Sequence, residues 1–308
     1  MNCNFSVIIP LYNKEAEIRD TVLSVLAQTY QPMEIVIVDD GSTDCSAEIV
    51  RSIHSPLVKL ISQPNAGECA ARNRAMDEST GDYMALVDAD DTWEPGFLAE
   101  IASMIEEFPD CGIYSTAFNI VSHEGVFPSN SPSERGVVAN FFRDSMTRYI
   151  SIPSASVIPK CVIDRIGGFP EGMKLGGDQY MWIKIARRYA VCFSPCRLSN
   201  YSKVASNRSS AIYTPERTHY TFEDLYDREA SSESNEFVAR AALGKALVIS
   251  AKGGTKEARQ TARFFAWTRD NRRTLRKVRV LNRLPVCWRS PLLNLYNRLA
   301  WAILKKGL

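Results

Sequence analysis

The sequence contains little of what zinc proteins and secreted proteins use. Its 308 residues include only three histidines, which lie far apart, and its eight cysteines form no CxxC pair. We therefore expect neither a zinc site nor a disulfide framework, and the thiols indicate a reducing cytosolic compartment. No uninterrupted run of about 18 apolar residues occurs, so no transmembrane helix is predicted. The start, MNCNFSVIIP, lacks a basic stretch and a long apolar segment, so we expect no signal peptide.

What is present is typical of a folded globular protein, with 45% apolar and 23% charged residues. The length exceeds the usual size of one domain and predicts a large domain with an appendage. The net charge of +2 is uninformative because the charges are unevenly distributed. Lys and Arg gather in 263–308, where Asp270 is the only acid.

Short apolar runs alternate with helical periodicity along the first third of the chain. The runs predict strands at 5–10, 34–38, 57–62 and 83–87, and the periodic segments predict helices at 15–28, 43–52, 68–77 and 95–108. Strand and helix in strict alternation indicate βαβ units and a mostly parallel sheet. Right-handed crossovers then place the carboxyl ends of these strands at one edge of the sheet.

Two of the predicted strands end in acids. Asp39 and Asp40 follow the second strand, and Asp88, Asp90 and Asp91 follow the fourth. Ligands of open α/β sheets bind at this edge, and hard divalent cations prefer oxygen ligands. The acids therefore indicate a metal site for a phosphate-bearing substrate. The alternative is a helix start with Asp91 as its cap and Glu94 completing a capping box. It leaves Asp88 and Asp90 unexplained, so we assign the cap to Asp91 alone.

Five motifs in order give the chain a resemblance to a known family. SVIIPLYNKEAEI, SVLAQTY, EIVIVDDGSTD, NAGECAARN and ALVDADD resemble a family-2 glycosyltransferase with the GT-A fold, continuously over 5–98 and more loosely to about 210. The resemblance implies an α/β, Rossmann-like, mostly parallel sheet flanked by helices. It places a catalytic domain at 1–214, with a nucleotide half at 1–110 and an acceptor half at 111–214. Residues 215–308 are then a basic helical extension.

The resemblance also implies roles for the residues in these motifs. A nucleotide-diphosphate sugar would be the donor, with UDP favoured, and Mn²⁺ or Mg²⁺ would be the cofactor held by Asp90. Asp88 would contact the ribose, or the metal through water. The remaining nucleotide-sugar contacts would come from Pro10, Tyr12, Asp39, Asp40, Asn65, Gly67, Arg72 and Ala89. Structural alternatives remain open: a turn at Asp39 and Asp40, packing of Tyr12, and an ion pair between Arg72 and an aspartate.

The catalytic base is expected at the start of a later helix, predicted at 179–189. Members of the family usually carry Glu-Asp or Asp-Asp there, whereas this chain has Gly177 followed by Asp178. In an inverting transfer one carboxylate accepts the proton of the acceptor hydroxyl, and we assign this role to Asp178. The alternative is that Asp178 caps the helix. For Trp182, four residues on, packing is favoured over stacking on a sugar.

One family segment is incomplete. After a strand at 198–203 the family often has a histidine that touches the diphosphate, and this chain has none there. Lys203 or Arg208 is expected to supply the positive charge instead.

The basic segment 263–308 interleaves Trp and Leu with Lys and Arg at helical spacing. This pattern is typical of a helix lying on anionic lipid, and it suits a lipid-linked acceptor. One alternative is a helical bundle packed on the catalytic domain. The other is a nucleic-acid patch, which we favour least, so we expect no nucleic acid as partner. A peripheral protein at the cytoplasmic face of the inner membrane is the resulting expectation.

Together these features predict an inverting hexosyl- or hexosaminyltransferase that acts on a glycan or lipid-linked acceptor in surface polysaccharide biosynthesis. One alternative is a degenerate glycan- or membrane-binding scaffold of the same fold, which Gly177 and the missing histidine favour. The other is a nucleotidylyltransferase, which usually has a Gly-rich loop with Arg and Lys after its first strand. Residues 10–13, PLYN, lack such a loop.

Overall fold

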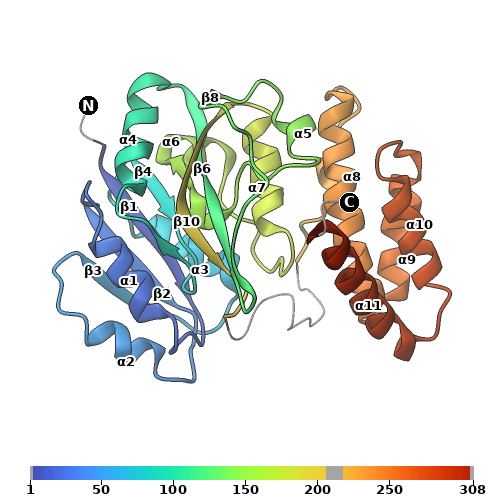
Figure 1. Ribbon diagram of the computed structural model, residues 1–308, viewed down its shortest axis with the longest axis horizontal. Helices are drawn as coiled ribbons and strands as arrows, with labels where there is room; N and C mark the ends of the chain where they lie inside the picture. The colour runs from blue at the N-terminus through green and yellow to red at the C-terminus, as the bar shows by residue number, and fades with distance from the viewer. Residues whose placement is uncertain (1–2, 206–217, 306–308) are drawn as a thin grey trace. The chain divides into compact units, whose positions relative to one another are not determined.

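A computed structural model describes residues 3–205 and 218–305, with side chains described as far as Tyr296. The chain divides into two compact units, 1–220 and 221–308 (Figure 1). The predicted boundary at 214/215 lies outside the described residues. None of the described helices is long and apolar enough to span a bilayer.

The first half of the large unit alternates strands and helices as predicted. Neighbouring strands in the order β3-β2-β1-β4 are all parallel, and β5 pairs elsewhere in the sheet. The elements are β1 (Phe5–Leu11), α1 (Ile18–Leu26), β2 (Glu34–Asp39), α2 (Ser46–Arg51), β3 (Val58–Ser62), α3 (Glu68–Asp77), β4 (Tyr83–Leu86), β5 (Thr92–Trp93) and α4 (Phe97–Glu107).

The second half extends the same sheet in the order β4-β9-β6-β10-β5. β9 runs antiparallel to β4 and β6, whereas β6 and β10 are parallel. The expected α/β fold is confirmed, with antiparallel pairs added in this half. Its elements are β6 (Cys111–Ser122), β7 (Gly125–Pro128), β8 (Gly136–Val137), α5 (Phe141–Asp144), a 3₁₀ turn (Pro153–Ala155), β9 (Ser156–Pro159), α6 (Lys160–Ile166), α7 (Gly177–Ala186) and β10 (Ala190–Ser202).

Helices cover both faces of the sheet. Apolar side chains of α1, α2 and α4, among them Val22, Val50 and Ile101, form one core with the strands. α3 lies against β1 and β2, and α7 lies against β6. α3 and α7 approach each other closely, because a Cβ atom built on Gly177 would lie 2.5 Å from Cys69 Sγ. These packed layers hold the strand ends in fixed positions.

The small unit is helical. α9, α10 and α11 all contact α8. Glu236, which is buried in α8, accepts hydrogen bonds from Arg269 N at 2.7 Å and from Asn271 Nδ2 at 3.0 Å, and so ties the connection between α9 and α10 to α8. The elements are a 3₁₀ turn (Glu223–Leu225), α8 (Ser232–Ala251), α9 (Thr255–Phe264), a 3₁₀ turn (Phe265–Trp267), α10 (Arg272–Leu281) and α11 (Val286–Lys305).

Candidate active site

The acid-terminated strands meet at one edge of the sheet, as predicted. β1 is the centre of this arrangement, with β2 parallel on one side and β4 parallel on the other. The chain leaves β1 toward β2 and returns to form β4 beyond β1, so the crevice between β1 and β4 is the switch point at which open α/β sheets bind ligands. Asp39 is the last residue of β2, Lys14 follows β1, and Asp88, Asp90 and Asp91 follow β4.

Asp39 and Asp40 have different partners although they are neighbours in the sequence. Asp40 is buried, and its carboxylate accepts hydrogen bonds from Gln63 Nε2, Ala66 N and Gly67 N, each at 2.8 Å. Asp40 therefore fastens the loop that leads into α3. Asp39 is also buried, and its Oδ1 accepts a hydrogen bond from the backbone N–H of Ser42 at 3.0 Å.

The same loop carries Asn65 and Gly67. Asn65 Nδ2 donates to the Asp40 carbonyl at 2.9 Å, and Gly67 has a φ of 95°, which favours glycine. The loop is thereby held beside the end of β2. Its exposed residues are available at the predicted nucleotide edge.

Arg72 of α3 forms a buried ion pair with the acids. Its guanidinium is 2% exposed and lies 2.5 Å from Asp88 Oδ1, and it also pairs with Glu68. Burial lowers the pKa of Arg72, but the charges of Glu68 and Asp88 raise it by more. The pKa is therefore above its ordinary value, and the guanidinium stays charged. The ring of Phe169 lies 5.2 Å from the guanidinium carbon. The ion-pair alternative for Arg72 is thus observed, and it places Arg72 against the acid cluster.

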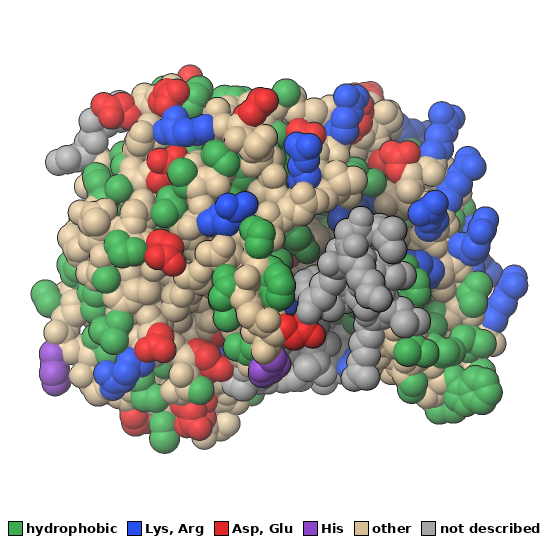
Figure 2. Space-filling model, in the orientation of Figure 1, with side chains coloured by type: hydrophobic (Ala, Val, Ile, Leu, Met, Phe, Trp, Pro, Cys, Tyr) green, Lys and Arg blue, Asp and Glu red, His purple; other side chains and the backbone are tan. Residues whose placement is uncertain are grey.

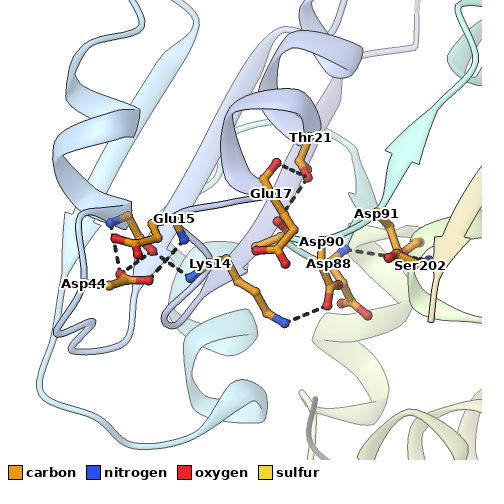
Figure 3. A network of polar contacts seen from close by, with 12 residues as sticks. Lys14, Glu15, Glu17, Thr21, Asp44, Asp88, Asp90, Asp91 and Ser202 are labelled. Carbon is orange, nitrogen blue, oxygen red and sulfur yellow. Dashed lines mark hydrogen bonds and ion pairs between the residues drawn. The ribbon is translucent and has the colours of Figure 1, made fainter. Parts of the chain in front are cut away.

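Lys14 reaches across the crevice to Asp90, as Figure 3 shows. Its ammonium nitrogen lies 2.7 Å from Asp90 Oδ2, and the Lys14 side chain is 11% exposed. Burial and the neighbouring charge of Asp88 raise the pKa of Asp90, although Lys14 opposes this shift. The predicted metal ligand therefore has a lysine as its partner in the protein.

Asp91 is not a helix cap, and this prediction is wrong. It is 1% exposed, and its carboxylate accepts from Ser202 N at 2.7 Å and from Ser154 Oγ. Figure 3 shows Asp91 turned toward Ser202, away from Lys14. α4 begins only at Phe97, because β5 intervenes. Asp91 instead fixes the end of β10 beside the turn of the acid cluster.

Asp178 lies in the first turn of α7, whose N-cap is Gly176, so it is not the N-cap residue. Burial raises the pKa of Asp178, and the charge of Asp88 raises it further, whereas Arg72 lowers it. The backbone of Gly177 lies against Cys69 of α3, and Arg72 of the same helix pairs with Asp88, so Asp178 lies near the acids after β4 although it is ninety residues away in the chain. The structure thus brings the predicted base and the predicted nucleotide edge together.

The remaining predicted residues lie where the motifs place them. Pro10 lies in β1 and Ala89 in the turn of the acid cluster, and both are buried. Tyr12, directly after β1, is 38% exposed and so is accessible for stacking. Trp182 is 2% exposed and packs edge-on against Phe169, so the packing alternative is confirmed.

Of the two cations considered for the diphosphate, Lys203 directly follows β10, and Arg208 lies outside the described residues. Sequence reasoning also missed Lys14, Glu68 and Ser154. Lys14 and Glu68 carried a signal, because Lys14 lies in the turn after β1 and Glu68 lies in the motif NAGECAARN, four residues before Arg72.

The model of the family "Glycosyl transferase family 2" matches residues 6–163, which include the acid-terminated strands and the loop at 63–67. The chain belongs to glycosyl transferase family 2. The resemblance carried by the five motifs is confirmed.

Relatives of this glycosyltransferase match part of its chain. An uncharacterized glycosyltransferase of Escherichia coli, YibD, is 44% identical over 33% of this chain and 30% of its own length. TuaG of Bacillus subtilis, which is named for teichuronic acid biosynthesis, is 35% identical over 39% of this chain and 48% of its own length. The chain thus spans a third to a half of these two relatives.

A solved structure resembles nearly the whole glycosyltransferase. S. aureus TarS residues 1–349, in complex with UDP-GlcNAc, superposes with a TM-score of 0.65 and covers 91% of this chain and 90% of its own, at 21% identity. At this identity the likeness shows the fold, and the predicted GT-A fold is confirmed.

Proposed function

We propose that this glycosyltransferase transfers a hexosyl or hexosaminyl group from a UDP-sugar to a glycan or lipid-linked acceptor, with inversion. The observation that carries the proposal is the convergence of Asp39, Asp88 and Asp90 at one sheet edge with Asp178 in electrostatic reach of Asp88. Binding of UDP-GlcNAc by the structural neighbour TarS supports the donor class. The name of TuaG supports an acceptor in surface polysaccharide biosynthesis, and we place the reaction on the cytoplasmic side of the inner membrane.

In this proposal the chain's own residues perform the transfer. The acceptor hydroxyl gives its proton to the Asp178 carboxylate as its oxygen attacks C1 of the sugar. The bond between C1 and the diphosphate oxygen breaks, and UDP leaves with the electron pair. Asp39 receives the nucleoside, Tyr12 stacks on the base, and Arg72 holds Asp88 in place.

Asp90 and Asp88 fit a metal that the donor helps to hold. No three His, Cys, Asp or Glu side chains within the described ranges cluster to bind a metal alone. Mg²⁺ however commonly uses one or two carboxylates and completes its shell with substrate phosphates and water. A bound Mg²⁺ or Mn²⁺ would supply a Lewis acid that neutralises the diphosphate. We propose Asp90 as its protein ligand, with Asp88 beside it.

A binding experiment tests the donor class and the metal together. We expect UDP and UDP-sugars to raise the melting temperature in the presence of Mn²⁺, because a ligand of the folded state stabilises it by mass action. GDP and dTDP should shift it less. Slow Mn²⁺-dependent hydrolysis of the UDP-sugar should accompany binding. A protein that binds UDP without any turnover would instead be the degenerate scaffold, and release of pyrophosphate from UTP and a sugar phosphate would indicate a nucleotidylyltransferase.

Lys14 gives a sharper test of the metal site. Because its ammonium occupies Asp90 Oδ2, it competes with a cation in the absence of nucleotide. We expect Lys14→Met to tighten nucleotide-free Mn²⁺ binding roughly two- to fivefold, the equivalent of losing an ion pair of about 0.5–1 kcal/mol. Free Mn²⁺ measured by electron paramagnetic resonance gives the affinity. Lys59→Met is the control, since Lys59 pairs with Glu78 on a different part of the unit. Equal affinities of the wild type and Lys14→Met contradict the assignment of Asp90.

A further inference from the structure

A buried arginine fixes the first turns of α11. Arg289 is 4% exposed, and its guanidinium donates to the carbonyls of Leu284 at 2.9 Å, Ser250 at 3.1 Å and Asn282 at 3.3 Å, and to Thr255 Oγ1 at 2.6 Å. These acceptors come from the end of α8, the start of α9 and the turn after α10. The side of α11 that carries Arg289 therefore faces the end of α8, the start of α9 and the turn after α10.

Several large apolar side chains in the described part of α11 are exposed. Trp288 is 62% exposed, Leu292 42%, Leu295 54% and Tyr296 47%. Their spacing of four, seven and eight residues from Trp288 places them on one side of the helix, and we call them the apolar stripe. Exposed large apolar side chains that lie together mark an interaction surface, since isolated ones are common but clustered ones are costly in water.

Cations border the apolar stripe. Lys277 of α10 donates to Tyr296 Oη at 2.7 Å, and its ammonium lies 4.0 Å from the centre of that ring, so α10 lies beside the stripe. Other cations of α10 and of the turn after it are exposed, and we call them the basic face: Arg272, Arg273, Arg276, Arg279 and Arg283. Figure 2 shows Lys and Arg side chains lining the surface of this unit at the right of the view.

The chemistry of this surface selects one kind of partner. Asp270 is the last acid in the sequence, so the basic face from Arg276 onward has no carboxylate side chain beside it in the chain. A second copy bound through the same stripe would bring like charges together, which disfavours association. Nucleic acid would satisfy the cations but leave Trp288 and the leucines in water. An anionic bilayer offers both phosphate groups and an apolar layer at the depth that a surface helix reaches.

We propose that the apolar stripe and the basic face form a docking surface for a membrane that contains anionic lipid. α11 lies in the interface with Trp288, Leu292 and Leu295 among the acyl chains, and the arginines of α10 contact the headgroups. This inference goes beyond the proposed transfer reaction and does not depend on it. It would hold the enzyme on the surface where a lipid-linked acceptor resides.

Co-sedimentation of the full-length protein with vesicles tests the proposal. We expect it to sediment with phosphatidylcholine vesicles that contain about 30% phosphatidylglycerol and not with vesicles of phosphatidylcholine alone. The anionic fraction is chosen to be roughly that of a natural anionic membrane. High salt should release part of the bound protein, because the headgroup contacts are screened. Equal binding to both kinds of vesicle, or to neither, overturns the proposal.

Two variants separate the contributions of the two surfaces. Trp288→Ala with Leu295→Ala should weaken binding at least tenfold, and Arg272→Gln with Arg273→Gln should weaken it and reduce its salt dependence. These side chains are exposed, so the melting temperature should change little. The matched control, Leu23→Ala with Arg51→Gln, changes exposed residues of the other unit and should bind as the wild type does.

The same variants distinguish the other occupants and the proposed function. If Trp288→Ala with Leu295→Ala abolishes a dimer seen in analytical ultracentrifugation and leaves vesicle binding intact, the stripe is a self-association surface and the proposal is wrong. Hydrolysis of a UDP-sugar in solution should be unaffected by both variants. Vesicle binding without any such hydrolysis would overturn the proposed function and leave the docking surface standing.

Discussion

At the scale of single residues, two adjacent aspartates show how position decides role. Asp40 is saturated by three donors from the loop at 63–67, whereas Asp39 accepts only a turn N–H and keeps an oxygen for a ligand. The pair thus divides into a structural carboxylate and a candidate nucleoside contact. Both are buried at the same edge, and Asp39 is the candidate ligand contact because fewer donors engage its carboxylate.

This division can be tested with matched substitutions. Asp40→Ala leaves two backbone N–H groups without their acceptor, and we expect it to lower the free energy of unfolding by about 1–3 kcal/mol. Asp39→Ala should cost little stability but weaken UDP binding by roughly tenfold, the equivalent of about 1.4 kcal/mol. Urea denaturation and calorimetric titration with UDP give the two quantities. The opposite pattern, with Asp39→Ala the less stable variant and unaltered in affinity, would reverse the roles.

Asp178 gives a prediction for the pH dependence of turnover. A base must be ionised, and burial together with Asp88 raises its pKa above the ordinary aspartate value of about 3.9. As the pH falls through this raised pKa the base becomes protonated, so kcat/KM should fall at a higher pH than an exposed aspartate would give. Asp178→Asn should reduce kcat by about 100- to 10,000-fold without weakening UDP binding. A variant that retains wild-type turnover excludes Asp178 as the base.

The positions of these acids could be predicted from the sequence, whereas their partners in hydrogen bonds and ion pairs could not. The acids after β2 and β4 could be predicted because strand ends in a parallel sheet share an edge. The partners of Asp90 and Asp91 could not, because Lys14 and Ser202 reach them across many residues of chain. The residues after Asp91 fit the sequence pattern of a capping box. In the structure the Asp91 carboxylate instead accepts a hydrogen bond from the backbone N–H of Ser202 at the end of β10.

At the scale of elements, the contact between α3 and α7 explains a departure from the family pattern. Position 177 is glycine where an acid is usual, and any side chain there would collide with Cys69 of α3. Cys69 is itself buried, with its thiol 3.5 Å from the Met173 carbonyl. The close approach of the helices therefore leaves Asp178 as the single acid at the start of α7.

Substitution at this contact should be rescued by its partner. Gly177→Ala is expected to destabilise the protein by about 1–3 kcal/mol, because the packed core must shift to accept the methyl group. Cys69→Ala removes the sulfur that it would meet, so the double variant should be more stable than the sum of the two changes predicts. Thermal denaturation of the four proteins completes the cycle. Simple additivity would show that the two positions do not interact.

Elements with strong local patterns could be predicted, and those shaped by pairing could not. α3 was expected at 68–77 and is Glu68–Asp77. β10 begins at Ala190 rather than at 198, because bulges between Ser194 and Ser199 interrupt the alternation that marks a strand. β7 is a strand only because it pairs with β6, and no local pattern in its four residues indicates that pairing.

At the scale of the whole molecule, the two units carry different surfaces. The large unit holds the acid-lined sheet edge, and the small unit carries the apolar stripe and the basic face. Each unit has its own core, with Val22 and Ile101 in the first and Val238 and Val278 buried in the second. Donor binding and lipid binding should therefore act on different segments of the chain.

Hydrogen exchange can separate the two interactions in one protein. UDP with Mn²⁺ should slow amide exchange at 39–42, 63–67 and 88–91, because the ligand orders the segments that follow β2, β3 and β4. Vesicles containing phosphatidylglycerol should instead slow exchange in α10 and α11 and leave those three segments unchanged. The effects should add when both ligands are present. If vesicles protect the segments at the sheet edge as strongly as UDP does, the lipid binds at the donor site and the division of roles between the units fails.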